Sequence, residues 1–132
     1  KDKTGVAETA EADTIIALGG GVHQKSDIAL FAEIAQKFNA KLMCSRALVE
    51  RGWLARNYQI GLSGQSVSPK LLITLGISGS LQFLAGIQDV KRLCCVSLDK
   101  DAPILKVADC PIVGDMYDII VELNHALSLN VK

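Results

Sequence analysis

Hydrophobic residues occur along the chain in short continuous runs, and most of these runs end at glycine or at small polar residues. The run at residues 14–18 (TIIAL) stops at three glycines, and the run at residues 71–75 (LLITL) stops at another. Continuous rather than alternating apolarity is typical of strands covered on both faces, as in a parallel sheet. The same pattern predicts strands at residues 41–44, 92–96 and 103–107.

The segments between these runs carry apolar residues at helical spacing. Residues 26–38 and 115–127 repeat apolar side chains at intervals of three and four, which predicts two amphipathic helices. Shorter helices are predicted at residues 47–52 and from Leu81 onward. Strands that alternate with helices indicate βαβ units, so the predicted fold is α/β, a doubly wound and mostly parallel sheet with helices on both faces (Rossmann-like).

Residues 57–69 contain two glycines, three serines and a terminal proline, with few large apolar groups. A loop of this length is long for a compact α/β domain, and such loops are usually functional or disordered. Its Gly-Leu-Ser-Gly core favours a functional loop, because glycine permits close approach of the backbone to a ligand.

The chain has 132 residues, with 14 Lys and Arg against 14 Asp and Glu, a length typical of one domain. The balanced charge gives no overall field that would attract nucleic acid or an anionic membrane. No apolar run reaches the ~18–20 residues that cross a bilayer. Residues 1–13 are polar, so we expect a linker or tail there, and we expect the folded domain at residues 14–132. Composition leaves open whether this domain is half of a longer protein.

The four cysteines form no CxxC pair, and no paired histidines occur at ligand spacing, so a metal site is not indicated. Cys94 and Cys95 lie inside an apolar run, where a thiol behaves as a small hydrophobe. We expect reduced, buried thiols in a cytosolic protein.

Ligands of doubly wound folds bind at the carboxyl ends of the strands. The first such segment, residues 19–24, meets neither the dinucleotide-binding nor the P-loop glycine pattern. After the second strand an NAD site requires an acidic residue, but this chain has Ser45 and Arg46. An arginine there can face a phosphate or a negatively charged ring, or it can start a solvated helix against the helix dipole.

Residues 76–82 form a turn of small residues that opens a helix, which fits either a phosphate cradle or an ordinary capped helix. Asp115 opens the last helix, and it can cap that helix or accept from a ribose hydroxyl. His23 and His125 have no partners at catalytic spacing, so both are predicted to be surface residues. Without a nucleophile triad or paired carboxylates, these segments favour holding a dinucleotide over acid–base chemistry.

The order of these motifs resembles the carboxy-terminal FAD-binding domain of the electron transfer flavoprotein alpha subunit, a DHS-like NAD/FAD-binding fold. The resemblance runs from Thr14 to Leu127, and the family's amino-terminal domain would lie outside this chain. The matching segments are Ser45–Ala47, Gly52–Trp53, Gln59–Gly64, Val67–Pro69, Gly76–Gly79, Gln82, Ala85–Gly86, Ala102–Ile104, Val107–Asp109 and Ile112–Asp115.

The resemblance implies FAD as cofactor and a role for particular positions. Arg46 would lie over the isoalloxazine ring, the Ser63 hydroxyl would bind flavin N5, and Ser78 through Gln82 would hold the pyrophosphate and ribityl region. Asp115 and Met116 would lie near the adenosine. The implied binding residues are Ser45, Arg46, Ile60, Gly61, Leu62, Ser63, Ser78, Gly79, Ser80, Leu81, Gln82, Phe83, Ser97, Asp115 and Met116.

Several positions depart from the family pattern. Phe83 stands where the family commonly has a histidine that donates to the flavin, and Ser97 stands where it commonly has asparagine. The usual arginine of the first glycine loop is replaced by Gly21 or Gly20, and the usual glutamine of the flavin loop by Leu62. The histidine that Phe83 replaces would donate a charged hydrogen bond to the flavin, and such a bond is worth ~1.5–3 kcal/mol. Without it, we expect weaker stabilisation of negative charge on the reduced flavin ring.

The resemblance implies an electron carrier rather than a catalytic enzyme, one that passes electrons from a flavin dehydrogenase to a downstream acceptor. Its partners would be the electron transfer flavoprotein beta subunit and a flavin-dependent dehydrogenase, with no nucleic acid and no membrane insertion. The expected location is the cytoplasm of a bacterium or the mitochondrial matrix of a eukaryote. The departures from the family pattern leave an alternative open, which is a structural or regulatory nucleotide-binding module that has lost tight flavin binding. The hypothesis of an NAD-dependent enzyme is disfavoured, because the chain lacks the required acidic residue and catalytic groups.

Overall fold

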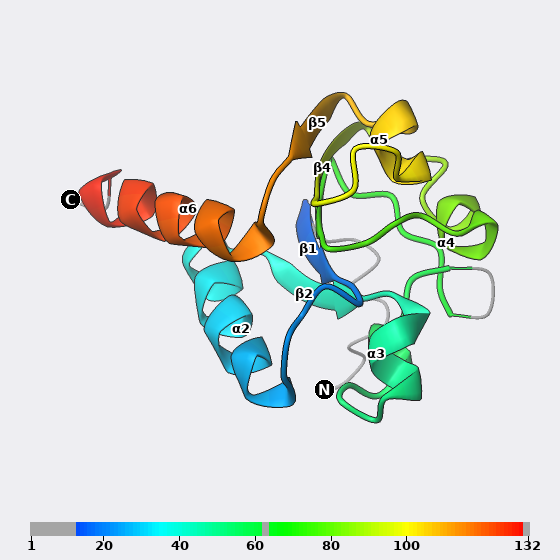
Figure 1. Ribbon diagram of the computed structural model, residues 1–132, viewed down its shortest axis with the longest axis horizontal. Helices are drawn as coiled ribbons and strands as arrows, with labels where there is room; N and C mark the ends of the chain where they lie inside the picture. The colour runs from blue at the N-terminus through cyan, green and yellow to red at the C-terminus, as the bar shows by residue number, and fades with distance from the viewer. Residues whose placement is uncertain (1–12, 62–63, 131–132) are drawn as a thin grey trace.

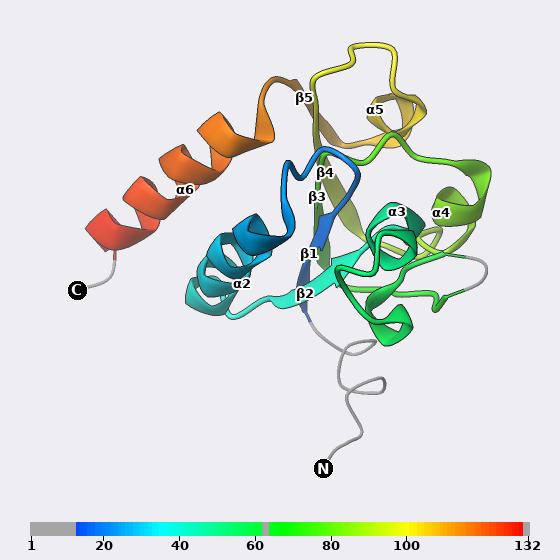
Figure 2. The same cartoon turned by 60° about the horizontal axis from the view of Figure 1, so that its bottom comes forward.

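The computed structural model describes residues 13–61 and 64–130, and the side chains only as far as residue 126. Its centre is a sheet of five parallel strands in the order β2-β1-β3-β4-β5 (Figures 1 and 2). The strands are β1 (Thr14–Leu18), β2 (Lys41–Cys44), β3 (Leu71–Leu75), β4 (Arg92–Ser97) and β5 (Cys110–Val113). The predicted doubly wound parallel sheet is therefore confirmed.

Helices cover both faces of this sheet (Figures 1 and 2). On one face α2 and α6 pack side by side, and on the other face α4 and α5 cover the sheet. The short α3 follows β2 directly. The bounds are η1 (Lys25–Asp27), α2 (Ile28–Lys37), α3 (Arg46–Glu50), η2 (Arg56–Tyr58), α4 (Leu81–Ala85), α5 (Pro103–Val107) and α6 (Met116–Asn130). Within the described residues no helix combines the length and apolarity that crossing a membrane requires.

The continuous apolar run of β1 is explained by burial on both faces. Ile15 and Ala17 pack in the cluster under α4 and α5, whereas Ile16 and Leu18 pack in the cluster under α2 and α6. Successive side chains of a strand point to opposite faces, so a strand between two helical layers needs apolar residues at every position. All four of these residues have at most 1% of their surface exposed.

The strand predicted at residues 103–107 is wrong, because this segment is the helix α5. Pro103 occupies the first turn of α5, where no amide donor is required, and Ile104 and Leu105 are buried. A run of only five apolar residues does not separate a short helix from a strand by its periodicity. The fifth strand lies instead at Cys110–Val113.

The carboxyl ends of the strands lie level at one edge of the sheet. Leu18 of β1 pairs in register with Cys44 of β2 and with Leu75 of β3. From β1 the chain continues to β2 on one side, and β3 is added on the other side, which makes the β1–β3 boundary the topological switch point. Loops that leave adjacent strands in opposite directions open a crevice at such a point.

Candidate functional site

Two adjoining hollows lie along the carboxyl edge of the sheet. The larger has a volume of about 640 Å³ and the smaller about 180 Å³. They share three residues at the exit of β3, Gly76, Ile77 and Ser78, so together they run from the end of β2 to the end of β5. This shape fits an elongated ligand that lies across the strand ends.

The larger hollow is bordered on one side by the start of α3. Ser45 is the N-cap of α3 and its N–H donates to the Leu18 carbonyl at 2.9 Å, which holds the helix start against β1. The Arg46 Nε lies 2.8 Å from Glu50 Oε2, and both side chains are more than half exposed. An exposed pair one helical turn apart contributes only ~0.3–0.5 kcal/mol, so this guanidinium is free to turn toward a ligand.

The second side of the larger hollow is the loop after η2. Gln59 and Ile60 are buried there, and Gly61 adopts a φ of 136°, which favours glycine. A Cβ on Gly61 would lie 3.1 Å from the Gln82 carbonyl oxygen, and one on Gly86 would lie 2.8 Å from Gly61 Cα. This packing of backbone on backbone holds the predicted functional loop against α4. Leu62 and Ser63, which were expected to contact the flavin ring, lie outside the described residues.

The turn from β3 into α4 forms the floor of the larger hollow. Gly76 and Gly79 have φ values of 72° and 92°, and Ser78, Gly79 and Ser80 all line the hollow. The Ser80 Oγ accepts from the Phe83 N–H at 3.2 Å, so Ser80 caps α4. The capped-helix interpretation is thus correct for Ser80. The same turn still presents its backbone to the hollow.

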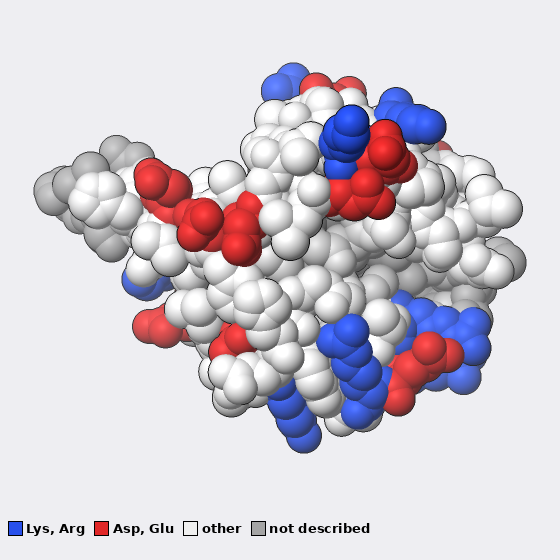
Figure 3. All heavy atoms as spheres, viewed as in Figure 1, with Lys and Arg blue, Asp and Glu red and all other residues white. Residues whose placement is uncertain are grey.

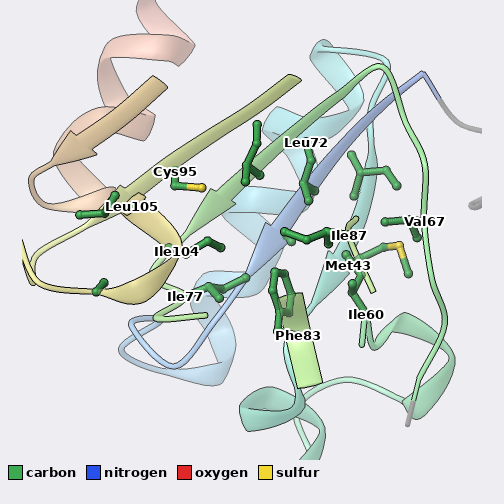
Figure 4. Close-up of a cluster of buried hydrophobic side chains, with 14 residues drawn as sticks. Met43, Ile60, Val67, Leu72, Ile77, Phe83, Ile87, Cys95, Ile104 and Leu105 are labelled. Atoms are coloured by element: carbon green, nitrogen blue, oxygen red, sulfur yellow. The ribbon is translucent and has the colours of Figure 1, made fainter. Parts of the chain in front are cut away.

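Three predicted positions on α4 have different environments. Gln82 is exposed and borders the larger hollow, as expected. Phe83 also borders it, but only 3% of Phe83 is exposed, and its ring packs with Ile60 and Ile77 (Figure 4). The Leu81 side chain is 83% exposed and borders a separate groove between α4 and α5, so it does not join the other predicted residues.

The smaller hollow brings together Ser97, Asp115 and Met116, three of the predicted residues. Asp115 Oδ1 accepts from the Tyr117 N–H at 2.8 Å, so this carboxylate caps α6. Ser97 Oγ accepts from the Asp99 N–H at 3.1 Å, which ties its hydroxyl to the turn after β4. With Asp99 also in its lining, this hollow has carboxylates at one end of the site, while Arg46 is at the other.

Basic side chains gather on the surface over α3, with acidic atoms among them (Figure 3). Arg51, the residue that follows α3, was not predicted as a functional residue. Its guanidinium donates to the carbonyls of Gly20 and Val22 at 3.1 and 3.2 Å, and it lies 4.8 Å from the Trp53 ring. Arg51 therefore holds the first glycine loop, whose Gly20 lines the larger hollow. No local pattern reveals this role, because the bonded residues are about thirty positions apart.

Tyr117 holds the same loop from the other side. Its hydroxyl accepts from the His23 N–H at 2.7 Å and donates to Asp27 Oδ2 at 2.6 Å, and the His23 ring stacks on it with centroids 4.2 Å apart. Burial raises the pKa of Tyr117, and the hydrogen bond to Asp27 raises it further. His23 and His125 are exposed, as predicted.

Replacing Arg51 by alanine is expected to lower the free energy of unfolding by about 1–2 kcal/mol, because two charge-assisted hydrogen bonds to the first glycine loop are lost at an exposed site. Arg51→Lys is expected to restore only part of this stability, since an ammonium lacks the planar fork that reaches two carbonyls. Chemical denaturation measures the free energy of unfolding, and Lys106→Ala controls for loss of one positive charge elsewhere. Wild-type stability in Arg51→Ala would show that the loop needs no such support.

None of the four cysteines lines either hollow. Within the two described ranges no three His, Cys, Asp or Glu residues form a group that could hold a metal ion. Cys44 and Cys95 are buried as expected, and burial raises the pKa of their thiols to about 12 and about 11. The expectation of burial is wrong for Cys110, which is exposed at the sheet edge, and Cys94 is half-buried.

Comparison with known proteins identifies the family of this chain. Residues 8–88 match the family described as "Electron transfer flavoprotein FAD-binding domain". The chain is 45% identical over 116 residues to the lactate dehydrogenase (NAD(+),ferredoxin) subunit LctC of Acetobacterium woodii, with 88% of this chain and 28% of LctC covered.

Two further relatives agree. Protein FixB of Clostridium saccharobutylicum is 41% identical over 93% of this chain and 37% of its own length. The electron transfer flavoprotein subunit alpha of Paracoccus denitrificans is 36% identical over 91% of this chain and 39% of its own. The chain thus spans between 28% and 39% of the length of these three relatives. It belongs to the electron transfer flavoprotein alpha-subunit family and corresponds to that family's FAD-binding domain.

Proposed function

We propose that this chain binds FAD across its two hollows and serves as the flavin-holding domain of an electron carrier. The observation that carries the proposal is the continuous crevice over five parallel strand ends, with Arg46 at one end and Asp115 at the other. Membership of a family described by FAD binding supports the same ligand. The flavin, when bound, supplies the redox chemistry, and the protein supplies its position and electrostatic surroundings.

Charge at the two ends of the crevice determines the orientation of the ligand in this proposal. The Arg46 guanidinium stabilises negative charge, so the isoalloxazine ring is placed in the larger hollow. Asp99 and Asp115 repel phosphate but accept hydrogen bonds from hydroxyls, so the adenosine ribose is placed in the smaller hollow. The pyrophosphate then lies between them, over the Ser78–Ser80 turn.

The backbone of that turn suits a pyrophosphate. Gly76 and Gly79 have positive φ values, and a Cβ on them would collide with Met116 and Ile104, so only glycine allows this tight turn. The first amides of a helix have no intrahelical acceptor. Ile60 and Gly61 would contact the ring through their backbone, with Ser45 beside Arg46. The contacts expected from Leu62 and Ser63 stay predictions, because both residues lie outside the described structure. No side chain in this arrangement needs to act as an acid, a base or a nucleophile.

The natural partners in this proposal are an electron transfer flavoprotein beta subunit and a flavin-dependent dehydrogenase. Support comes from the names of the relatives, which include electron transfer flavoprotein alpha subunits and a subunit of a lactate dehydrogenase. The proposed domain comprises residues 14–132, preceded by a linker of which residues 1–12 lie outside the described structure.

Absorption spectroscopy of the purified protein tests the proposal. We expect a yellow preparation that releases FAD on denaturation, or a colourless one that takes up one equivalent of added FAD, with and without the beta subunit. Titration with ADP in parallel identifies the alternative, a nucleotide-binding module without tight flavin binding. Binding of ADP without any uptake of FAD would overturn the proposed electron-carrier function and support that alternative.

A further inference from the structure

Cys94 and Cys110 lie next to each other on adjacent strands. The parallel pairing of β4 with β5 places Cys94 in register with Cys110. Adjacent strands are ~4.8 Å apart, which lies within the ~4.4–6.8 Å between the Cα atoms of a disulfide. Both thiols are on the same face of the sheet, since Cys95 packs on the opposite face, under α4 and α5.

The surroundings hold these two cysteines together and leave one of them accessible. Asp109 donates its N–H to the Leu93 carbonyl at 2.8 Å and accepts from the Leu93 N–H at 2.7 Å through Oδ2. These paired bonds join the two strands immediately before the cysteines. Cys110 is exposed and Cys94 is half-buried, so reagents in solution reach Cys110 first.

We propose that Cys94 and Cys110 form a reversible thiol–disulfide site that reacts with low-molecular-weight disulfides. The site is separate from both hollows and does not depend on the proposed binding of FAD.

The reaction follows from the difference in exposure. The Cys110 thiolate attacks a small disulfide, which forms a mixed disulfide and releases one small thiol. Cys94 then loses its proton and attacks the Cys110 sulfur, which forms the protein disulfide and releases the second small thiol. Two protein thiols are oxidised and one small disulfide is reduced to two thiols. Burial raises the pKa of Cys94, and a hydrogen bond with Cys110 raises it further, so the half-buried Cys94 is the poorer first nucleophile of the two.

The disulfide would close the segment between the two strands into a ring. That segment contains α5 and the Asp99 turn that borders the smaller hollow. A crosslink between two fixed points stabilises a fold chiefly by restricting the unfolded chain. We therefore expect the oxidised protein to melt several degrees above the reduced protein in the absence of reductant.

The test uses the reduced, purified protein with oxidised glutathione, acid quenching, alkylation of free thiols and tryptic mass spectrometry. Cleavage after Arg92, Lys100 and Lys106 separates the two cysteines into peptides 93–100 and 107–132. We expect these peptides to be linked, with loss of two hydrogens, and we expect the link to persist in Cys95→Ala, which removes a buried thiol on the other face. Reductant should restore both free peptides.

Two variants separate the steps. Cys94→Ser should accumulate a stable glutathione adduct on Cys110, because the second thiol is missing. Cys110→Ser should give neither adduct nor link. The proposal is overturned if the wild-type protein accumulates the same adduct as Cys94→Ser without a linked peptide, or if it shows no modification under conditions that oxidise a model dithiol.

Discussion

Replacing Gly19 by alanine is expected to lower the free energy of unfolding by about 3 kcal/mol. A Cβ at this position would overlap the Gly76 carbonyl oxygen and lie 2.5 Å from Ile77 Cγ1. The Gly19 N–H also donates to the Leu75 carbonyl at 3.0 Å, so the exits of β1 and β3 are held in direct contact. Overpacking commonly costs ~1–3 kcal/mol, and two adjacent central strands leave little room to relax.

Gly20→Ala is the matched control, because a Cβ there meets only Arg51 Nη2 at 3.4 Å and Ala47 Cβ at 3.7 Å, which are ordinary contacts. Its stability should stay within about 1 kcal/mol of the wild type. Chemical denaturation of both variants gives the two free energies of unfolding. Equal losses in the two variants would contradict the close contact between the first and third strand exits.

Replacing Arg46 by glutamine is expected to lower the midpoint potential of bound FAD by about 40–80 mV. This prediction rests on the proposed placement of the flavin ring in the larger hollow, which Arg46 lines. A cation beside the ring stabilises the reduced, negatively charged form by ~1–2 kcal/mol, and ~1.4 kcal/mol corresponds to ~59 mV for a one-electron couple. Spectroscopic redox titration measures the potential, and the melting temperature should change little because Arg46 is exposed.

Glu50→Gln is expected to shift the midpoint potential in the opposite direction. It removes the carboxylate that lies 2.8 Å from Arg46 Nε, so the potential should rise. The rise should be about 10–20 mV, since such an exposed pair contributes only ~0.3–0.5 kcal/mol. If Arg46→Gln binds FAD with an unchanged potential, the guanidinium does not face the ring, even though FAD binding itself stands.

Much of the fold could be predicted because local patterns and tertiary packing agree. Ile15 and Ile16 face opposite layers, and this double burial is what the continuous apolar run of β1 indicates. The segment at residues 103–107 is different, because it is apolar but too short for its period to be read. Only its contacts distinguish helix from strand there, among them the bond from the Ile104 N–H to the Ser78 carbonyl.

The position of the candidate site was predictable, because it lies at the carboxyl ends of the strands. Parallel strands bring all their carboxyl ends to one edge, so the segments after β1, β2, β3 and β4 were expected together, and the structure brings them together. The direction of single side chains was not predictable, as Leu81 illustrates by pointing to another groove. The expected convergence of Ser63 with Arg46 stays a prediction, because Ser63 lies outside the described residues.

The layers, the sheet edge that carries the site and the family follow from the amino-acid sequence alone, because hydrophobic periodicity and ordered motifs are properties of neighbouring residues. The folded arrangement was needed to show which distant groups meet: Arg51 on the first glycine loop, Tyr117 on its other side, and Cys94 beside Cys110. Such contacts depend on strand order and register, which are set by the packing of the whole sheet.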